Sequence, residues 1–83
     1  MSATTLARPR ENFPARVSGL TITPAAPGLW RVSRTGGAVL GHIELRNEGG
    51  VERYAARRLV SGGIRSTPLG EFWSPSAAAA CFR

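Results

Sequence analysis

The sequence lacks the residues on which most disulfide and metal sites depend. It contains a single cysteine, Cys81, and a single histidine, His42. One cysteine cannot form an intrachain disulfide, and one residue of each type excludes the usual zinc ligand sets. We therefore expect no disulfide framework, no metal and no other cofactor, and a cysteine content compatible with a reducing compartment.

Long apolar runs are also missing. No stretch approaches the ~20 residues that a helix needs to span a membrane. The first residues carry Arg8 and Arg10 but lack the apolar segment of about 7–15 residues found in secretory signals. We expect a soluble, cytoplasmic protein without a membrane partner, and its 83 residues leave room for one small domain.

Lysine is absent, so all 11 basic residues are arginines, and with 5 acidic residues the net charge is +6. The missing lysine has two interpretations: the codon bias of a GC-rich genome, which would not explain the net charge, or the use of arginine as a ligand for phosphate and guanine. The planar guanidinium of arginine binds phosphate and guanine through two parallel hydrogen bonds. The positive balance therefore points to a polyanionic partner.

Residues 1–28 hold four of the six prolines and show no sustained helical or strand period. We expect a flexible, basic, proline-rich arm here. Within it, residues 16–23 are the one stretch able to pair as an edge strand before Pro24 ends it. Such an arm either grips phosphates or a minor groove, or is a solvated terminus.

From residue 29 apolar and polar residues alternate between glycine turns, which is typical of β-strands. Three strands of an antiparallel meander are expected, joined by tight hairpins. The strands cover residues 29–34, 38–46 and 51–59, with turns at Gly36-Gly37 and Gly49-Gly50.

A third turn at Ser61-Gly62-Gly63 leads into a short strand or an irregular return that ends at Leu69. Pro68 places this piece at an edge of the sheet, because proline cannot donate to a central ladder. The residues expected to face the core are Trp30, Val32, Val39, Ile43, Leu45, Tyr54 and Ala56.

The C-terminal segment predicts one short helix. Ser74 suits the N-cap and Pro75 the first helical position, and four alanines then favour helix. The helix is expected over residues 75–83, covering the apolar face of the sheet. The expected fold is thus α+β: a three-stranded antiparallel meander, with a possible extra edge strand, packed by one C-terminal helix in a domain of residues 29–83.

This pattern resembles a group of small β-β-β-α DNA-binding domains. The resemblance rests on the hairpin glycines, on Tyr54-Ala55-Ala56-Arg57, and on Leu69-Gly70-Glu71-Phe72 before a Ser/Pro-initiated, alanine-rich helix. It is to ethylene-response-factor-like domains and to the arm-binding domains of phage-type tyrosine recombinases, and it covers residues 29–83. It implies a sheet lying in the DNA major groove with the helix on its back, although the helix here is shorter and less acidic.

Alternation places six polar residues on the outward face of the sheet, and the resemblance implies that they contact DNA. A well-placed bidentate arginine contributes ~1–3 kcal/mol of base discrimination. The other interpretation is a solvated sheet face on which Glu44 and Glu52 pair with the arginines. The candidate nucleic-acid-binding residues are Arg31, Ser33, His42, Arg46, Arg53 and Arg57.

No catalytic constellation accompanies the pair of His42 and Glu44, and the glycine pairs precede no helix, as a phosphate-binding loop requires. We expect a non-enzymatic protein with no catalytic residues. The leading hypothesis is a module that binds duplex DNA through its sheet. The alternatives are a protein-interaction module, acting as a small regulator or accessory subunit of a larger complex, and association with RNA through the same arginines, for which paired exposed aromatics are lacking.

Overall fold

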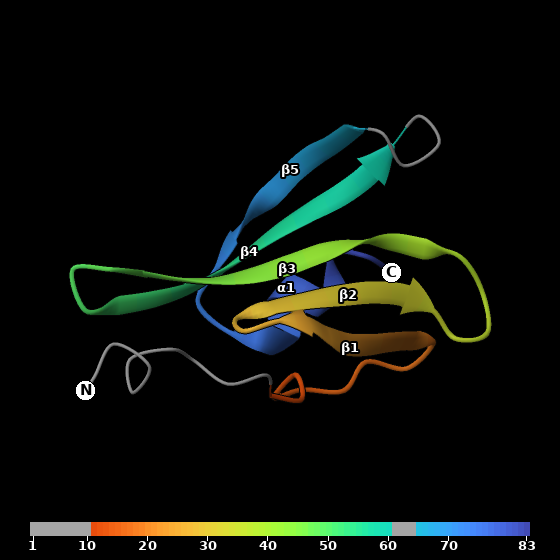
Figure 1. Cartoon of the computed structure of the whole chain (residues 1–83), viewed down its shortest axis with the longest axis horizontal. Helices are drawn as coiled ribbons and strands as arrows, with labels where there is room; N and C mark the ends of the chain where they lie inside the picture. Colours follow the sequence, from red (N-terminus) through yellow and green to blue (C-terminus); the bar gives the residue numbers. More distant parts are fainter. Residues whose placement is uncertain (1–10, 61–64) are drawn as a thin grey trace.

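The computed structural model describes residues 11–60 and 65–83, which form an antiparallel sheet and one short helix (Figure 1). The strands follow one another across the sheet in chain order. This confirms the α+β class and the C-terminal helix, but the sheet has five strands where three were expected. The elements are β1 (Leu20–Ala26), β2 (Leu29–Arg34), β3 (Val39–Glu48), β4 (Val51–Val60), β5 (Arg65–Phe72) and α1 (Pro75–Ala80).

The two additional strands lie at the two edges of the sheet. β5 realises the edge piece that Pro68 indicated, although it runs on to Phe72. β1 comes from the segment assigned to the flexible arm, and its pairing with β2 extends past Pro24 to Ala26 with a register shift. Proline is tolerated there because one side of an edge strand needs no ladder partner. The boundary placed at residue 28 thus falls inside the β1–β2 hairpin.

The β3–β4 hairpin has the expected tight turn. Gly49 and Gly50 have φ values of 62° and 83°, and the flanking Glu48 and Val51 pair directly. Two successive positive φ values identify a two-residue loop of the type that matches strand twist, and glycine adopts them without strain. The turn expected at Ser61-Gly62-Gly63 lies outside the described residues.

The helix begins where the sequence predicts and ends earlier. Ser74 is the N-cap, its hydroxyl accepts a hydrogen bond from the Ala77 N–H at 3.1 Å, and Pro75 opens the helix. The helix ends at Ala80 instead of Arg83. The chain then tightens, because Phe82 donates its N–H to the Ala79 carbonyl, three residues back. Phe82 is thereby turned into the core.

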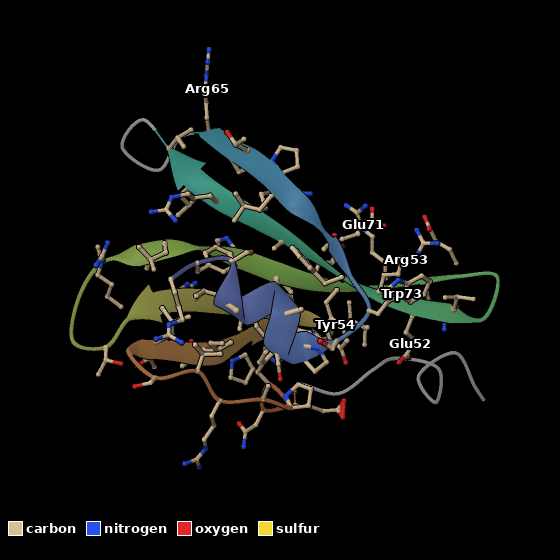
Figure 2. All side chains as sticks on the ribbon, turned by 180° about the vertical axis from the view of Figure 1, so that it is seen from behind. Glu52, Arg53, Tyr54, Arg65, Glu71 and Trp73 are labelled. Carbon is tan, nitrogen blue, oxygen red and sulfur yellow. The ribbon has the colours of Figure 1, made fainter. Side chains whose placement is uncertain are left out.

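One face of the sheet and the helix form the hydrophobic core. The views of Figures 1 and 2, from opposite sides, show α1 against this inner face, while the other face is uncovered. Among the described residues, no helix is long or apolar enough to cross a membrane. The buried side chains are Phe13, Trp30, Val32, Leu40, Ile43, Ala56, Ala78, Ala79 and Phe82.

Two core residues differ from expectation. Val39 is 41% exposed and Leu40 is buried in its place, because a bulge shifts the β2–β3 register after Val32 and offsets the alternation. Phe13, from the segment expected to be a flexible arm, packs edge-on against Trp30, with the two ring centroids 5.2 Å apart. The Trp30 indole N–H donates to the Glu11 carbonyl at 2.7 Å, so the segment before β1 helps to close the core.

Gly41 of β3 has no room for a side chain between β4 and the C-terminal segment. A Cβ at this position would collide with the Arg57 carbonyl oxygen and lie 2.8 Å from the Phe82 ring. Glycine therefore lets β3 lie directly against β4 while Phe82 fills the inner face below it.

Candidate nucleic-acid interface

The six candidate residues share the face of the sheet opposite α1, here called the outer face. Their strand neighbours Trp30, Val32 and Ile43 are buried on the inner face, and side chains alternate along a strand. The structure does not make the six equivalent, because strand register divides them into separate groups.

Arg31, His42 and Arg57 form a central row, in which residues of β2, β3 and β4 stand directly opposite one another. Arg31 and Arg57 are exposed, and His42 between them is half-buried. Within the described residues, neither arginine forms an ion pair. The central row therefore presents two uncompensated guanidinium groups on either side of an imidazole.

The electrostatics of the row act on His42. Its burial, and secondly the positive charges of Arg31 and then Arg57, hold the pKa of the imidazole below its usual value of 6.5. His42 is consequently neutral near pH 7. An anion placed over the row would offset the two guanidinium charges and favour protonation of this ring.

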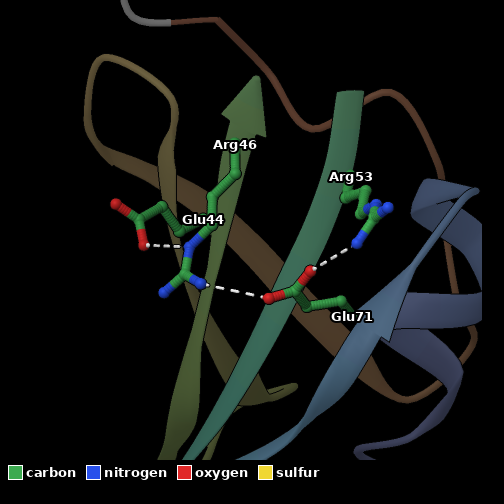
Figure 3. A network of polar contacts seen from close by, with 4 residues as sticks. All are labelled: Glu44, Arg46, Arg53 and Glu71. Carbon is green, nitrogen blue, oxygen red and sulfur yellow. Dashed lines mark hydrogen bonds and ion pairs between the residues drawn. The ribbon is translucent and has the colours of Figure 1, made fainter. Parts of the chain in front are cut away.

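Arg46 and Arg53 also lie directly opposite each other, on β3 and β4, but carboxylates hold both (Figure 3). Glu71 of β5 accepts from Arg46 at 3.1 Å and from Arg53 at 3.3 Å. Glu44 accepts from the Arg46 Nε at 3.2 Å. These four residues, here called the paired end, carry no net charge, and Glu71 offsets the repulsion between the facing arginines.

Trp73 adds a further constraint to the paired end. The Arg53 guanidinium lies over the Trp73 ring, with its Cζ 4.9 Å from the ring centroid, and Trp73 is 71% exposed (Figure 2). A stack of this kind stabilises an exposed pair by about 0.5–1 kcal/mol. The Arg53 Nε is buried without a hydrogen-bond partner. Arg53 is thus oriented by its surroundings within the fold.

Ser33 stands apart from both groups. It lies at the bulged end of β2, opposite Thr21 of β1 and Val39 of β3. It is half-buried and follows the residue at which the register shifts. The structure therefore brings together three of the six candidates in the central row, holds two in the paired end and leaves Ser33 at the side.

The sequence interpretation missed a groove on the outer face. The groove has a volume of about 290 Å³ and begins beside the central row. The alternation of β4 places Arg57 and Leu59 on the same face, so this part of the lining could have been predicted from the sequence. No sequence pattern indicated that Arg65 and Ser66 of β5 would complete the lining. The lining residues are Leu29, His42, Glu44, Ala55, Arg57, Leu59, Arg65 and Ser66.

Within residues 11–60 and 65–83, no group of three or more histidine, cysteine or acidic side chains is placed to hold a metal ion. Comparison of the chain with protein-family models, with curated proteins and with solved structures finds no match. The resemblance to small DNA-binding domains accordingly stays a prediction.

Proposed function

We propose that this protein is a small, non-enzymatic nucleic-acid-binding module that contacts duplex DNA through the outer face of its sheet. The observation that carries the proposal is the central row. Arg31 and Arg57 project from the uncovered face, flank His42 and make no ion pair within the described residues. The net charge of +6 supports a polyanionic partner. We propose that the protein acts in the cytoplasm.

The dimensions of the row suit a duplex. Neighbouring strands lie ~4.8 Å apart, so the two steps from β2 to β4 span about 10 Å. The major groove of B-DNA is about 12 Å wide. A five-stranded sheet does not enter such a groove across its whole width. The proposed contact is therefore centred on β2, β3 and β4, with Arg31 and Arg57 reaching base edges or the phosphates on either side.

The paired end has a smaller part in this proposal. Arg46 and Arg53 would have to leave Glu71, and Arg53 its stack on Trp73, before either could bind a phosphate. We assign the principal contacts to Arg31, His42 and Arg57, and secondary contacts to Arg46, Arg53 and Ser33.

The test is fluorescence anisotropy with a labelled random-sequence duplex between about 50 and 200 mM salt. Neutralising two or three phosphates gives a slope of log K against log salt of roughly −2 to −3. Arg31→Ala and Arg57→Ala should each reduce the slope by about 1. Arg34→Ala is the matched control, since Arg34 lies on the same strand as Arg31 but beside Phe82 on the helix side.

Absence of binding at the lowest salt would overturn the proposal. An equal loss of affinity in the Arg34→Ala control would also overturn it, because the attraction would then belong to the net charge and not to the outer face.

A protein-interaction module, acting as a small regulator or accessory subunit, is the second candidate, and Trp73 is the observation that favours it. Exposed tryptophan and arginine are enriched among the residues that dominate protein interfaces. The adjoining β5 is an edge strand able to accept a strand from a partner. This function predicts a stoichiometric complex that survives nuclease treatment, is lost in Trp73→Ala and is retained in Arg31→Ala.

A further inference from the structure

The outer groove forms where the sheet splits. The ladder between β3 and β4 begins at the pair Gly41–Arg58, and beyond it Leu59 pairs only with Ser66 of β5. In Figure 1 this end of the β4–β5 hairpin turns away from β3. The divergence opens a space of about 290 Å³ between the hairpin and the middle of the sheet.

The lining of the groove is amphipathic. Leu29, Ala55 and Leu59 supply apolar surface, and Ala55 is the smallest side chain among the lining residues. His42, Arg57 and Ser66 supply hydrogen-bonding groups. Arg65 stands at the rim, with its side chain extended away from the strands (Figure 2).

We propose that this groove binds a small organic phosphate, that is, a phosphate ester with an apolar or planar body. The phosphate lies against Arg57, Ser66 and His42, and the body lies on Leu29, Ala55 and Leu59. This inference does not rest on duplex binding, since the groove is a hollow formed by side chains of four strands.

The donors favour a phosphate over a carboxylate. A guanidinium presents its N–H groups as a planar fork, and a serine hydroxyl and an imidazole each add a donor. A phosphate monoester has three terminal oxygens for these groups, whereas a carboxylate has two. The aliphatic residues give the ester body a surface that inorganic phosphate does not use.

Glu44 is the acidic residue in the lining, and its charge is already engaged. Its carboxylate accepts from the Arg46 Nε at 3.2 Å, in the ion pair that belongs to the paired end. The groove therefore retains the positive charge of Arg57, with that of Arg65 at its rim. The paired end thus acts on the groove indirectly: because Arg46 neutralises Glu44, Glu44 repels an anion in the groove less.

Size limits the ligand. Binding pockets for small molecules are typically about 300–1,000 Å³, so this groove is at the lower end and suits a ligand no larger than about one nucleotide. His42 and Arg57 belong both to the groove and to the central row. A ligand in the groove would consequently compete with any duplex bound through that row.

The experiment is a titration of the whole chain with phenyl phosphate, followed by ¹H–¹⁵N NMR. Shifts should concentrate on the groove residues, and the affinity should exceed those for inorganic phosphate and benzoate by about tenfold each. Ala55→Leu fills the floor without changing a charge and should weaken phenyl phosphate binding about tenfold while leaving inorganic phosphate unaffected. Arg57→Ala should weaken both phosphates, and Arg34→Ala neither.

Circular dichroism and the unfolding midpoint of each variant establish that it is folded. Equal affinities for phenyl phosphate and inorganic phosphate, or shifts scattered away from the groove, would overturn the inference. Binding of phenyl phosphate that persists unchanged in Ala55→Leu would do the same. Duplex binding without phenyl phosphate binding removes this inference alone, whereas phenyl phosphate binding without duplex binding removes only the proposed DNA contact.

Discussion

Two pairs of arginines occupy the same face of this sheet in opposite circumstances. Arg46 and Arg53 face each other and share the carboxylate of Glu71, and Arg53 is also stacked on Trp73. Arg31 and Arg57 are separated by His42 and have no acidic partner within the described residues. The formal charge of a strand is therefore a poor measure of the charge it offers to a ligand, since a neighbouring strand can neutralise it.

The largest expected effect is on the packing that holds the central row together. In Gly41→Ala the added Cβ collides with the Arg57 backbone and crowds Phe82. We expect a loss of about 3 kcal/mol in the free energy of unfolding, at the upper end for overpacking, measured by urea denaturation. Gly37→Ala is the milder control, since its added Cβ would lie 3.2 Å from the Arg34 Cβ, a tight contact but not the overlap expected at Gly41. Equal stabilities of the two variants would contradict the close approach at Gly41.

The second effect separates the two arginine pairs directly. The double variant Arg31→Ala/Arg57→Ala should lose about two units of the salt slope for duplex DNA, because it removes the two uncompensated charges. Arg46→Ala/Arg53→Ala removes the same formal charge but should lose clearly less, because its arginines are already paired. Anisotropy titrations compare them, and identical losses would show that pairing with Glu71 has no bearing on binding.

A third, smaller effect is expected when the arginines of the paired end are released from Glu71 and so become comparable with those of the central row. Glu71→Gln keeps the side-chain shape but removes the charge shared by Arg46 and Arg53. We expect a gain of a few-fold in duplex affinity at low salt. The cost in stability should be at most about 1 kcal/mol, because the side chains of these pairs are each more than a third exposed and solvent screens them. Unchanged DNA affinity with normal stability would indicate that the paired end does not reach the ligand.

The smallest effect is the pH response of the central row. Because the pKa of His42 is lowered in the fold by burial, Arg31 and Arg57, the unfolded chain takes up the proton more readily. The stability contributed by neutral His42 is fully present above pH 6.5, the usual pKa of histidine, and is lost as the pH falls through the lowered pKa of the folded state. Urea denaturation at about pH 5.5 and 7.5 should show lower stability at the acidic pH. His42→Gln should remove this difference, and its persistence in that variant would assign the pH response to other groups.

Local sequence signals predicted much of the fold and of the outer face. The alternation over residues 29–34 and 51–59 identifies β2 and β4, and Ser74-Pro75 marks the helix start that the structure confirms. The alternation also places Arg31, His42 and Arg57 on one face. The alternation fails at Val39 and Leu40, where a bulge exchanges the two sides of β3. The sequence signals also miss β1, because a proline in an edge strand resembles the end of a strand.

The sequence alone determined the class of fold, the helix start and the polar side of the sheet, because these follow from residue periodicity, glycine turns and capping over a few neighbouring positions. Only the tertiary structure decided which arginines are available. Glu71 lies 18 residues from Arg53 along the chain and 3.3 Å from it in space, and the groove depends on where β4 leaves β3. The first is set by the β4–β5 register and the second by the limit of the β3–β4 ladder at Gly41–Arg58, and both arise from strand pairing and from the twist of the sheet.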